Sequence, residues 1–360
     1  MNSNFGIINN FFDELKNNKC IVNGRIYDLK SIEELGYKEF IMNFHRLPKF
    51  KLYKYFPNTY TVTKEGKEIN YSIEALKNNE VYLNNATNFD DCFDCVIDIN
   101  YEKFCNIRLN KYCEYFNLST KMHENDNKFL KEKISSYLTE MLFSRKENDI
   151  YNEITDDLKK LKVRWFVKKF LEKYLPTKDS IISIDSILAD ERSEFTEKLS
   201  EFRITCFSTS PYLNRMWSEY ANKNKGFCVE YDIDLNNKDI SKDIYYNLFP
   251  VIYAQKRSDA SFLCTMIDDH ASEKELWQLC FNGFLRKSFY WVDQCEWRLA
   301  LPKSMIESNP LKFYKISRVY FGSKMDKEDE ENIKKICKEK NIDTIKIMME
   351  ENSFNLIDCK

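Results

Sequence analysis

The segment that most constrains the fold is KSFYWVDQCEWRLAL, residues 287–301. Its aromatic and apolar residues predict one strand inside a sheet. Side chains two positions apart on a strand point to the same face, so Gln294 and Glu296 should project side by side. A carboxylate on an internal strand needs a partner or a chemical role. Gln294 and Glu296 are therefore candidate catalytic residues. The alternatives are a surface carboxylate on an edge strand, or an ion pair between Glu296 and Arg298.

Composition limits the classes of protein to which the chain can belong. Its 360 residues can bury the core of one large or two ordinary domains, and 43% apolar with 31% charged residues indicate a globular chain. The net charge of −2 gives no basic surface for unspecific nucleic-acid binding. Most of the 12 cysteines stand in apolar patterns, which favours buried, reduced thiols over disulfides.

The amino terminus, MNSNFGIINNFF, lacks the basic and apolar regions of a signal peptide. No run approaches the roughly 18 to 20 apolar residues of a membrane span. We therefore expect a cytoplasmic protein with no membrane partner.

Strand and helix patterns follow one another in blocks, without the regular βαβ rhythm of a parallel sheet, which predicts an α+β fold. We expect a helical amino-terminal extension (1–49), then an α+β core (50–325) that carries a helical insertion (110–200). A carboxy-terminal helix and β-hairpin (326–360) should pack on this core. Core strands are expected at residues 50–56, 203–210, 226–233, 249–254 and 316–323.

A hydroxyl-rich triplet, Ser208-Thr209-Ser210, ends one of these strands just before Pro211. Hydroxyls at a strand end can hydrogen-bond a catalytic carboxylate and fix its rotamer, so Ser208 and Ser210 are candidate catalytic residues. The alternative is a turn, because Ser and Thr before Pro commonly form one.

Aromatic residues offer candidate walls for a binding pocket. Trp217 and Tyr220 are three apart on an expected helix and share one face. Tyr53 and Tyr55 share one face of an early strand, and Lys54 should face the opposite way. The alternatives are ordinary core for the helix, and a half-buried strand with its lysine in solvent.

A third cluster, NFDDCFDC, brings Asp90, Asp91 and Asp94 close to Cys92 and Cys95. The Cys-x-x-Cys pair has no second copy, and the histidines of the chain lie far off in sequence without ligand spacing. A structural turn is favoured over a metal site, and we expect no metal.

The order of these motifs resembles one bacterial family. LYKYF, NNATNFDDCFDC, ITCFSTSPYLNRMWSEYANKNKGFCVEYD, VIYA, DQCEWRLAL and VYFGS follow one another as in the domain of unknown function number 2971, over residues 50–325. The family usually has Pro where this chain has Cys92, and Glu where it has Gln294. This family name implies no activity.

A second resemblance concerns mechanism. A residue on an early strand, then Ser-Thr-Ser, then Gln-x-Glu is similar to the pattern of the ADP-ribosyltransferase superfamily. That resemblance implies a split, mixed or antiparallel β-sheet core that clamps NAD. The corresponding residues are, in chain order, Tyr53 or Tyr55, Ser208, Ser210, Gln294 and Glu296.

The resemblance implies that NAD is the substrate and that Glu296 stabilises positive charge on the ribose as the nicotinamide–ribose bond breaks. Ser208 or Ser210 would orient Glu296, and Gln294 would position an acceptor. Tyr53, Tyr55, Trp217 and Tyr220 would contact the nicotinamide or the adenine.

Our leading hypothesis is an NAD-dependent ADP-ribosyltransferase or NAD glycohydrolase, acting as an intracellular toxin or phage-defence effector. The acceptor is a protein, a nucleic acid or water, and the helical insertion is a candidate surface for a partner protein. A second hypothesis, motivated by the 15% aromatic content and the lack of a nucleophile–base pair, is a non-catalytic sensor module that binds a nucleotide or peptide. A third is a metal-dependent nuclease that uses Asp90, Asp91, Asp94 and Glu296.

Overall fold

The computed structural model describes residues 19–35, 39–40, 43, 48–89, 94–98, 100, 193, 196–197, 199–257, 259, 261 and 281–359. The chain divides into two compact units. The first comprises Met1–Val96, Leu199–Arg257 and Trp277–Lys360, and contains every helix and strand named below. The second comprises Ile97–Lys198 and Ser258–Leu276, where an isolated bridge pairs Asp98 with Asp259. The expected helical insertion falls almost entirely outside the described residues.

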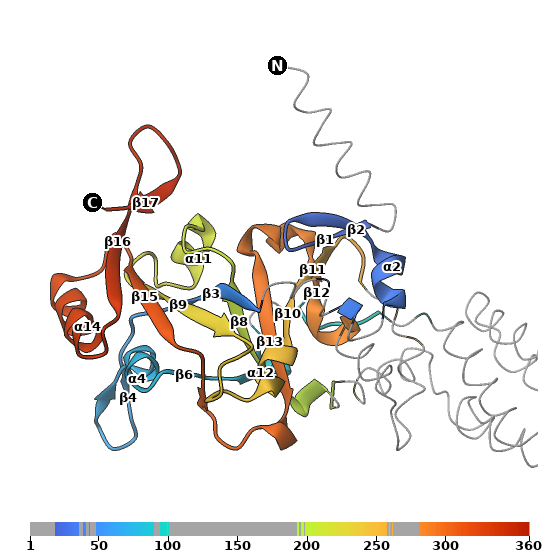
Figure 1. The fold of residues 1–360 in the computed structure, drawn as a ribbon, viewed down its shortest axis with the longest axis horizontal. Helices are drawn as coiled ribbons and strands as arrows, with labels where there is room; N and C mark the ends of the chain where they lie inside the picture. Colours follow the sequence, from blue (N-terminus) through green and yellow to red (C-terminus); the bar gives the residue numbers. More distant parts are fainter. Residues whose placement is uncertain are drawn as a thin grey trace, which may run out of the picture. The chain divides into compact units, whose positions relative to one another are not determined.

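A nine-stranded sheet, counted over the described residues, forms the centre of the first unit (Figure 1). Its strands lie in the order β10-β13-β8-β3-β9-β15-β16-β17, and β7 pairs with β8 outside this path. Their bounds are β3 (Lys49–Phe56), β7 (Asn84–Asn85), β8 (Phe202–Ser208), β9 (Phe227–Asp234), β10 (Leu248–Pro250), β13 (Glu296–Pro302), β15 (Ile316–Phe321), β16 (Asp343–Met349) and β17 (Leu356–Asp358). The β15–β16 pair is parallel and the other pairs are antiparallel. This mixed sheet with few helices confirms the α+β class.

Three smaller sheets complete the described strands. One has the order β12-β11-β1-β2, and the others are the pairs β14–β6 and β4–β5. Their bounds are β1 (Lys19–Val22), β2 (Arg25–Asp28), β4 (Thr61–Val62), β5 (Glu68–Ile69), β6 (Glu80–Val81), β11 (Ile252–Ala254), β12 (Arg286–Ser288) and β14 (Leu311–Lys312). The described α-helices are α2 (Leu29–Glu34), α4 (Tyr71–Asn78), α11 (Asn214–Glu219), α12 (Lys242–Tyr246) and α14 (Lys327–Glu339). Short irregular helices are η1 (Ala86–Asn88), η3 (Phe281–Leu285), η4 (Phe289–Gln294) and η5 (Lys303–Met305).

The expectation of helix throughout residues 1–49 is wrong for residues 19–28, which form the antiparallel hairpin β1–β2. Asn23 and Gly24 make its turn, with φ angles of 49° and 75°. Positive φ at both central residues is the geometry of a type I′ hairpin turn, which Asn-Gly favours strongly. Local turn chemistry therefore decides the structure of this stretch.

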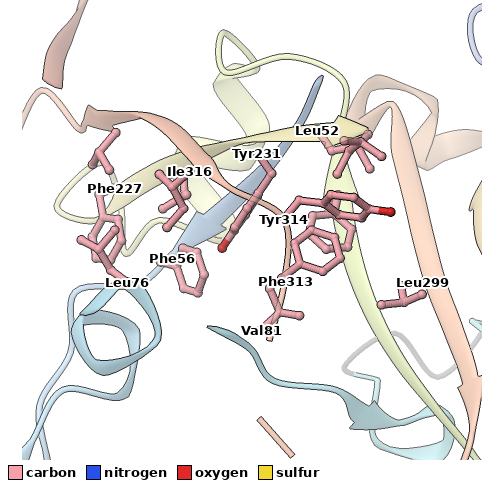
Figure 2. Packing of buried hydrophobic residues seen from close by; sticks show 14 of the residues in the cluster. Leu52, Phe56, Leu76, Val81, Phe227, Tyr231, Leu299, Phe313, Tyr314 and Ile316 are labelled. Atoms are coloured by element: carbon pink, nitrogen blue, oxygen red, sulfur yellow. The ribbon is translucent and has the colours of Figure 1, made fainter. Parts of the chain in front are cut away.

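The alternation of β3 assigns its side chains to two apolar clusters. Leu52 and Phe56 belong to the main core, which α4, α12 and α14 also enter. Figure 2 shows part of this core, with Phe313 and Tyr314 beside Tyr231. Tyr55 belongs to a cluster that includes Trp217 of α11. Leu52 and Phe56 thus pack into a different cluster from Tyr53 and Tyr55.

The expectation of one strand over residues 287–301 is wrong. The segment forms the end of β12, the 3-10 helix η4 and most of β13. Cys295 separates η4 from β13 in a left-handed conformation, with φ 45°. A residue in that conformation reverses the chain locally. This turn, and not strand alternation, directs the side chains of Gln294 and Glu296 to the same lysine, Lys287.

The sheet splits between β3 and β8. β3 pairs with β9 along its whole length, and β8 pairs with β13 along its whole length. Between β3 and β8, the described register contains the single pair Tyr53 and Ser208. Past that pair, the same edge of β8 pairs with β7 instead of β3. The opening between the two strands is where the candidate site lies.

Candidate functional site

Three candidate residues form a row across neighbouring strands. Tyr53 of β3 lies opposite Ser208 of β8, and Ser208 lies opposite Glu296 of β13. Directly opposed residues of antiparallel strands place their side chains on the same face. Segments more than 80 positions apart in the chain therefore converge at the point where the sheet splits.

A cavity of about 230 Å³ lies beside this row. Five of the predicted site residues line it: Tyr53, Tyr55, Tyr220, Gln294 and Glu296. Further polar and aromatic lining comes from Lys54, Tyr82, Phe89, Asp94, Cys206 and Lys287. The cavity combines aromatic rings with a small set of convergent charged groups, which is typical of small-molecule sites.

Glu296 is held by two cations. Its Oε1 accepts from Arg298 Nε at 2.7 Å, and its Oε2 accepts from Lys287 Nζ at 2.7 Å. Burial alone would raise the pKa of Glu296, but the charges of Arg298 and then Lys287 bring it well below its usual range. The carboxylate is therefore ionised near neutral pH, which suits an electrostatic role and not that of a general acid.

Asp94 completes a buried group of four charges. It accepts from both terminal nitrogens of Arg298, at 2.9 and 2.6 Å, and its Oδ2 lies 3.3 Å from Lys287 Nζ. The exposed fractions of the four side chains are 0% for Arg298, 3% for Asp94 and 6% for both Glu296 and Lys287. Two anions and two cations cancel, so this quartet is neutral as a whole. The predicted alternative for Glu296, an ion pair with Arg298, is present together with the cavity.

Gln294 joins the quartet to the aromatic wall. Its Oε1 accepts from Lys287 Nζ at 2.9 Å, and its Nε2 donates to the Tyr220 hydroxyl at 3.1 Å. Gln294 and Glu296 thus share one lysine, because the left-handed Cys295 turns the backbone between them. Both ends of this amide are therefore fixed by hydrogen bonds, and the amide gives one wall of the pocket a polar group.

Ser208 and Ser210 were predicted to hydrogen-bond the carboxylate of Glu296, but each hydroxyl has a different partner. The buried Ser208 hydroxyl donates to the Gln294 carbonyl oxygen at 2.7 Å. The Ser210 hydroxyl oxygen accepts from the backbone N–H of Tyr212 at 3.1 Å, as in a turn. The structure therefore contains the turn that was the alternative for this triplet. Ser208 holds the backbone of Gln294.

Trp217 lies outside the cavity lining, in the core. It is 1% exposed, its indole N–H donates to the carbonyl oxygen of Pro211 at 2.7 Å, and its ring meets that of Tyr55 edge to face at 5.2 Å. The Tyr55 hydroxyl donates to the Ser210 carbonyl oxygen at 2.9 Å. Trp217 therefore supports one wall of the pocket through Tyr55.

Both tyrosines of β3 stay neutral phenols. Burial, followed by the charge of Glu230, raises the pKa of Tyr53, and burial raises the pKa of Tyr55. Glu230 of β9 lies opposite Tyr53, is buried, and accepts from Ser317 and Tyr320 as well as from Lys51. Tyr53 therefore links the pocket to a second buried carboxylate.

Sequence reasoning missed three pocket residues of consequence. The alternative for this strand placed Lys54 in solvent, yet Lys54 is half-buried and donates to Thr205 Oγ1 at 2.8 Å and to the Cys206 carbonyl oxygen at 3.0 Å. Lys287 was part of the segment first singled out but received no role. Asp94 was considered for metal binding and instead forms the bidentate pair with Arg298. A basic residue within a strongly apolar strand pattern was the available signal for both lysines.

The described residues provide no metal site for the nuclease hypothesis. Asp90, Asp91 and Cys92 lie outside the described residues. Among the residues that are described, no group of three His, Cys, Asp or Glu side chains lies close enough to hold a metal ion. The described helices also include none that is long and apolar enough to cross a membrane.

Comparison with known proteins gives one finding. No curated protein and no solved structure matches the chain. One family model matches residues 216–299, a span that contains Tyr220, Lys287, Gln294, Glu296 and Arg298 but not β3 or β8. Over that span the resemblance drawn from the motifs is confirmed: residues 216–299 match the family described as "Protein of unknown function (DUF2971)".

Proposed function

We propose that the cavity binds the nicotinamide–ribose end of NAD and that the protein breaks the bond between them, as an ADP-ribosyltransferase or an NAD glycohydrolase. The observation that carries this proposal is the row of Tyr53, Ser208 and Glu296 beside the cavity. The split between β3 and β8 supports an ADP-ribosyltransferase-like sheet. The cavity volume of about 230 Å³ is below the roughly 300–1,000 Å³ of sites for drug-sized ligands, which suits one end of a dinucleotide.

The chemistry needs a fixed negative charge near the ribose. The bond between the ribose C1′ and the pyridinium nitrogen breaks, its electron pair leaves with nicotinamide, and positive charge remains on the ribose. The ionised Glu296 carboxylate stabilises that charge and can accept a hydrogen bond from a ribose hydroxyl. Lys287 and Arg298 hold one oxygen each, so the carboxylate needs no reorganisation when the charge develops.

The Gln294 amide favours a neutral acceptor. Water, an alcohol or an amide would attack the ribose carbon and release one proton to solvent. An amide side chain is a poor general base, and both ends of Gln294 are already hydrogen-bonded to Lys287 and Tyr220. Hydrolysis of NAD to ADP-ribose and nicotinamide is therefore the simplest activity for this arrangement.

The test is release of nicotinamide from NAD by the purified protein. Glu296→Gln should lower the rate about 10²-fold or more, since the developing charge loses its counter-ion. Asp293→Asn is the matched control, because Asp293 is an exposed carboxylate three positions away that bonds Arg215 at 3.2 Å outside the cavity. Thermal unfolding of each variant separates lost activity from lost folding. Equal rates in the wild type and in a folded Glu296→Gln variant would remove Glu296 from the mechanism.

A second candidate function is a non-catalytic sensor module that binds a nucleotide. It is favoured by one observation: the reactive groups at this site are already engaged. Ser208 donates to a carbonyl oxygen, both Glu296 oxygens bond cations, and burial raises the pKa of the Cys206 thiol so that it stays protonated. Binding of NAD by calorimetry without any nicotinamide release, over hours and with candidate acceptors added, would favour this function over the enzyme.

A further inference from the structure

Lys54 occupies the split in the sheet. Its ammonium group bonds Thr205 Oγ1 and the Cys206 carbonyl oxygen of β8, across the gap in which β3 and β8 have no ladder pairs. It also lies 5.4 Å from the ring centroid of Phe207 and 5.8 Å from that of Phe56. Two of its three N–H donors are thus used by neutral oxygens, and the side chain borders the cavity.

Lys54 takes no part in the ion pairs of the pocket. The quartet of Glu296, Asp94, Lys287 and Arg298 is neutral through its own ion pairs. In the described part of the chain, no carboxylate lies within the 4.0 Å ion-pair distance of the Lys54 ammonium. Among the described residues that line the cavity, Lys54 is therefore a cation with no carboxylate at ion-pair distance.

We infer that Lys54 is the anion-binding residue of this pocket and that the ligand is a phosphorylated nucleotide, not an unphosphorylated nucleoside. The inference rests on the proposed function in that both place a nucleotide in the same cavity. A phosphate oxygen takes the third N–H donor of Lys54, while Tyr53 and Tyr55 from the same strand contact the neighbouring sugar or ring. The aromatic lining beside this lysine favours a ligand that offers both a ring and a phosphate.

Burial strengthens this contact. A cation partly removed from water interacts strongly with an incoming anion because little solvent screens the pair. Burial lowers the pKa of Lys54, opposed by the nearby Cys206 and Glu296. A phosphate beside Lys54 favours the charged form, so ligand binding offsets the free-energy cost of burying this ammonium group.

The experiment compares nicotinamide mononucleotide with nicotinamide riboside, which lacks only the phosphate, by isothermal titration calorimetry on the full chain. The wild type should bind the mononucleotide at least about tenfold more tightly. Lys54→Met should abolish that preference. Lys54→Gln keeps hydrogen-bond donors for Thr205 and Cys206 without the charge, and should lose the preference as well. Lys49→Met is the matched control: Lys49 lies on the same strand, is exposed and pairs with Asp234 at 2.8 Å, outside the cavity.

Retention of the preference in either folded Lys54 variant would overturn the inference, as would equal binding of the two ligands, or no binding of either, by the wild type. Nicotinamide release is measured in parallel. A Lys54-dependent preference without release leaves the inference standing and refutes the enzyme. Release whose KM for NAD is the same in Lys54→Met as in the wild type refutes the inference and leaves the enzyme.

Discussion

Ser208 lies directly opposite Glu296 on strands β8 and β13, yet its hydroxyl donates to the carbonyl oxygen of Gln294, at 2.7 Å. The serine therefore holds the end of the 3-10 helix η4 against the sheet. The serine holds the backbone of Gln294, one residue before the left-handed Cys295. It therefore affects the position of Glu296 through the backbone and not through the carboxylate. Positioning of the pocket depends on this buried bond.

Ser208→Ala should destabilise the protein by about 1–3 kcal/mol, because the Gln294 carbonyl oxygen loses its donor in a buried setting. Urea denaturation measures the change. Ser72 provides a matched control, since its hydroxyl also donates to a backbone carbonyl at 2.7 Å, that of Pro57, but in an exposed position. Ser72→Ala should cost less than about 0.5 kcal/mol, because water replaces the lost bond. Equal losses in the two variants would contradict the role given to Ser208.

Arg298→Met should cost about 3–5 kcal/mol in free energy of unfolding. The change leaves Asp94 and Glu296 buried with Lys287 as their remaining cation, and an uncompensated buried charge is strongly destabilising. Arg215→Met is the control, because Arg215 forms exposed pairs with Glu219 and Asp293. Exposed pairs contribute about 0–1 kcal/mol. A loss below about 1 kcal/mol for Arg298→Met would show that the quartet does not stabilise the fold.

Acid should destabilise the protein through two buried carboxylates. Burial would raise the pKa values of Glu296 and Glu230, but Arg298 and Lys287 lower that of Glu296, and hydrogen bonds from Lys51, Ser317 and Tyr320 lower that of Glu230. An unfolded Glu titrates near pH 4.3, so the stabilisation is complete above about that pH and is lost as pH falls toward the folded pKa values.

Urea midpoints measured from pH 7 to pH 3 should therefore fall below about pH 4.5. Glu230→Gln should reduce the steepness of that fall, because one of the two groups no longer titrates. A midpoint that rises on acidification, or that falls equally steeply in Glu230→Gln, would refute this assignment.

Cys295 tests the backbone turn between η4 and β13. A left-handed conformation costs a residue with a Cβ about 1–2 kcal/mol, and β-branched residues adopt it least readily. Cys295 already bears this cost, so the branched Cβ of Cys295→Val should destabilise the protein further, by about 1 kcal/mol. In Cys295→Gly the relieved strain is offset by the larger backbone entropy that Gly loses on folding, so the free energy of unfolding should change by less than about 1 kcal/mol. The same Cys-to-Val change at the exposed Cys359 provides the control. Tolerance of Val at position 295 would contradict the φ of 45°.

The strands of the core were predictable because their residues alternate or form uniform apolar runs. The predictions at 50–56, 203–210, 226–233 and 316–323 are confirmed by β3, β8, β9 and β15, whereas the run at 249–254 divides into β10 and β11, which belong to different sheets. The hairpin at Asn23 and Gly24 was also encoded locally, in its Asn-Gly pair, but was overlooked. Local chemistry thus accounts for most elements of the described core.

The site was less predictable because it depends on strand neighbours. Gln294 and Glu296 were correctly predicted to lie together, but a left-handed residue and a shared lysine bring them together, not strand alternation. The roles of Lys54 and Asp94 follow from the split between β3 and β8 and from the contact of Asp94 with Arg298, 204 positions away in sequence. No short-range pattern encodes which strands become neighbours.

Gly226 tests the close approach of backbones beside the pocket. A Cβ there would collide with the carbonyl oxygen of Phe56 at the end of β3, and would lie 3.0 Å from the backbone of Ala221. Gly226→Ala should therefore cost about 1–3 kcal/mol, since backbone must move to make room. Because β3 carries Tyr53, Lys54 and Tyr55, this shift should also weaken ligand binding.

Gly66→Ala separates crowding from backbone strain. Gly66 has φ +79° and no heavy atom within 4 Å of an added Cβ, so its substitution is strained without a collision. It should cost about 1 kcal/mol and leave ligand binding unchanged, because the turn between β4 and β5 lies outside the cavity lining. Urea denaturation and calorimetric titration of both variants measure the two effects. A larger loss of stability in Gly66→Ala than in Gly226→Ala would show that the contact between Gly226 and Phe56 does not constrain β3.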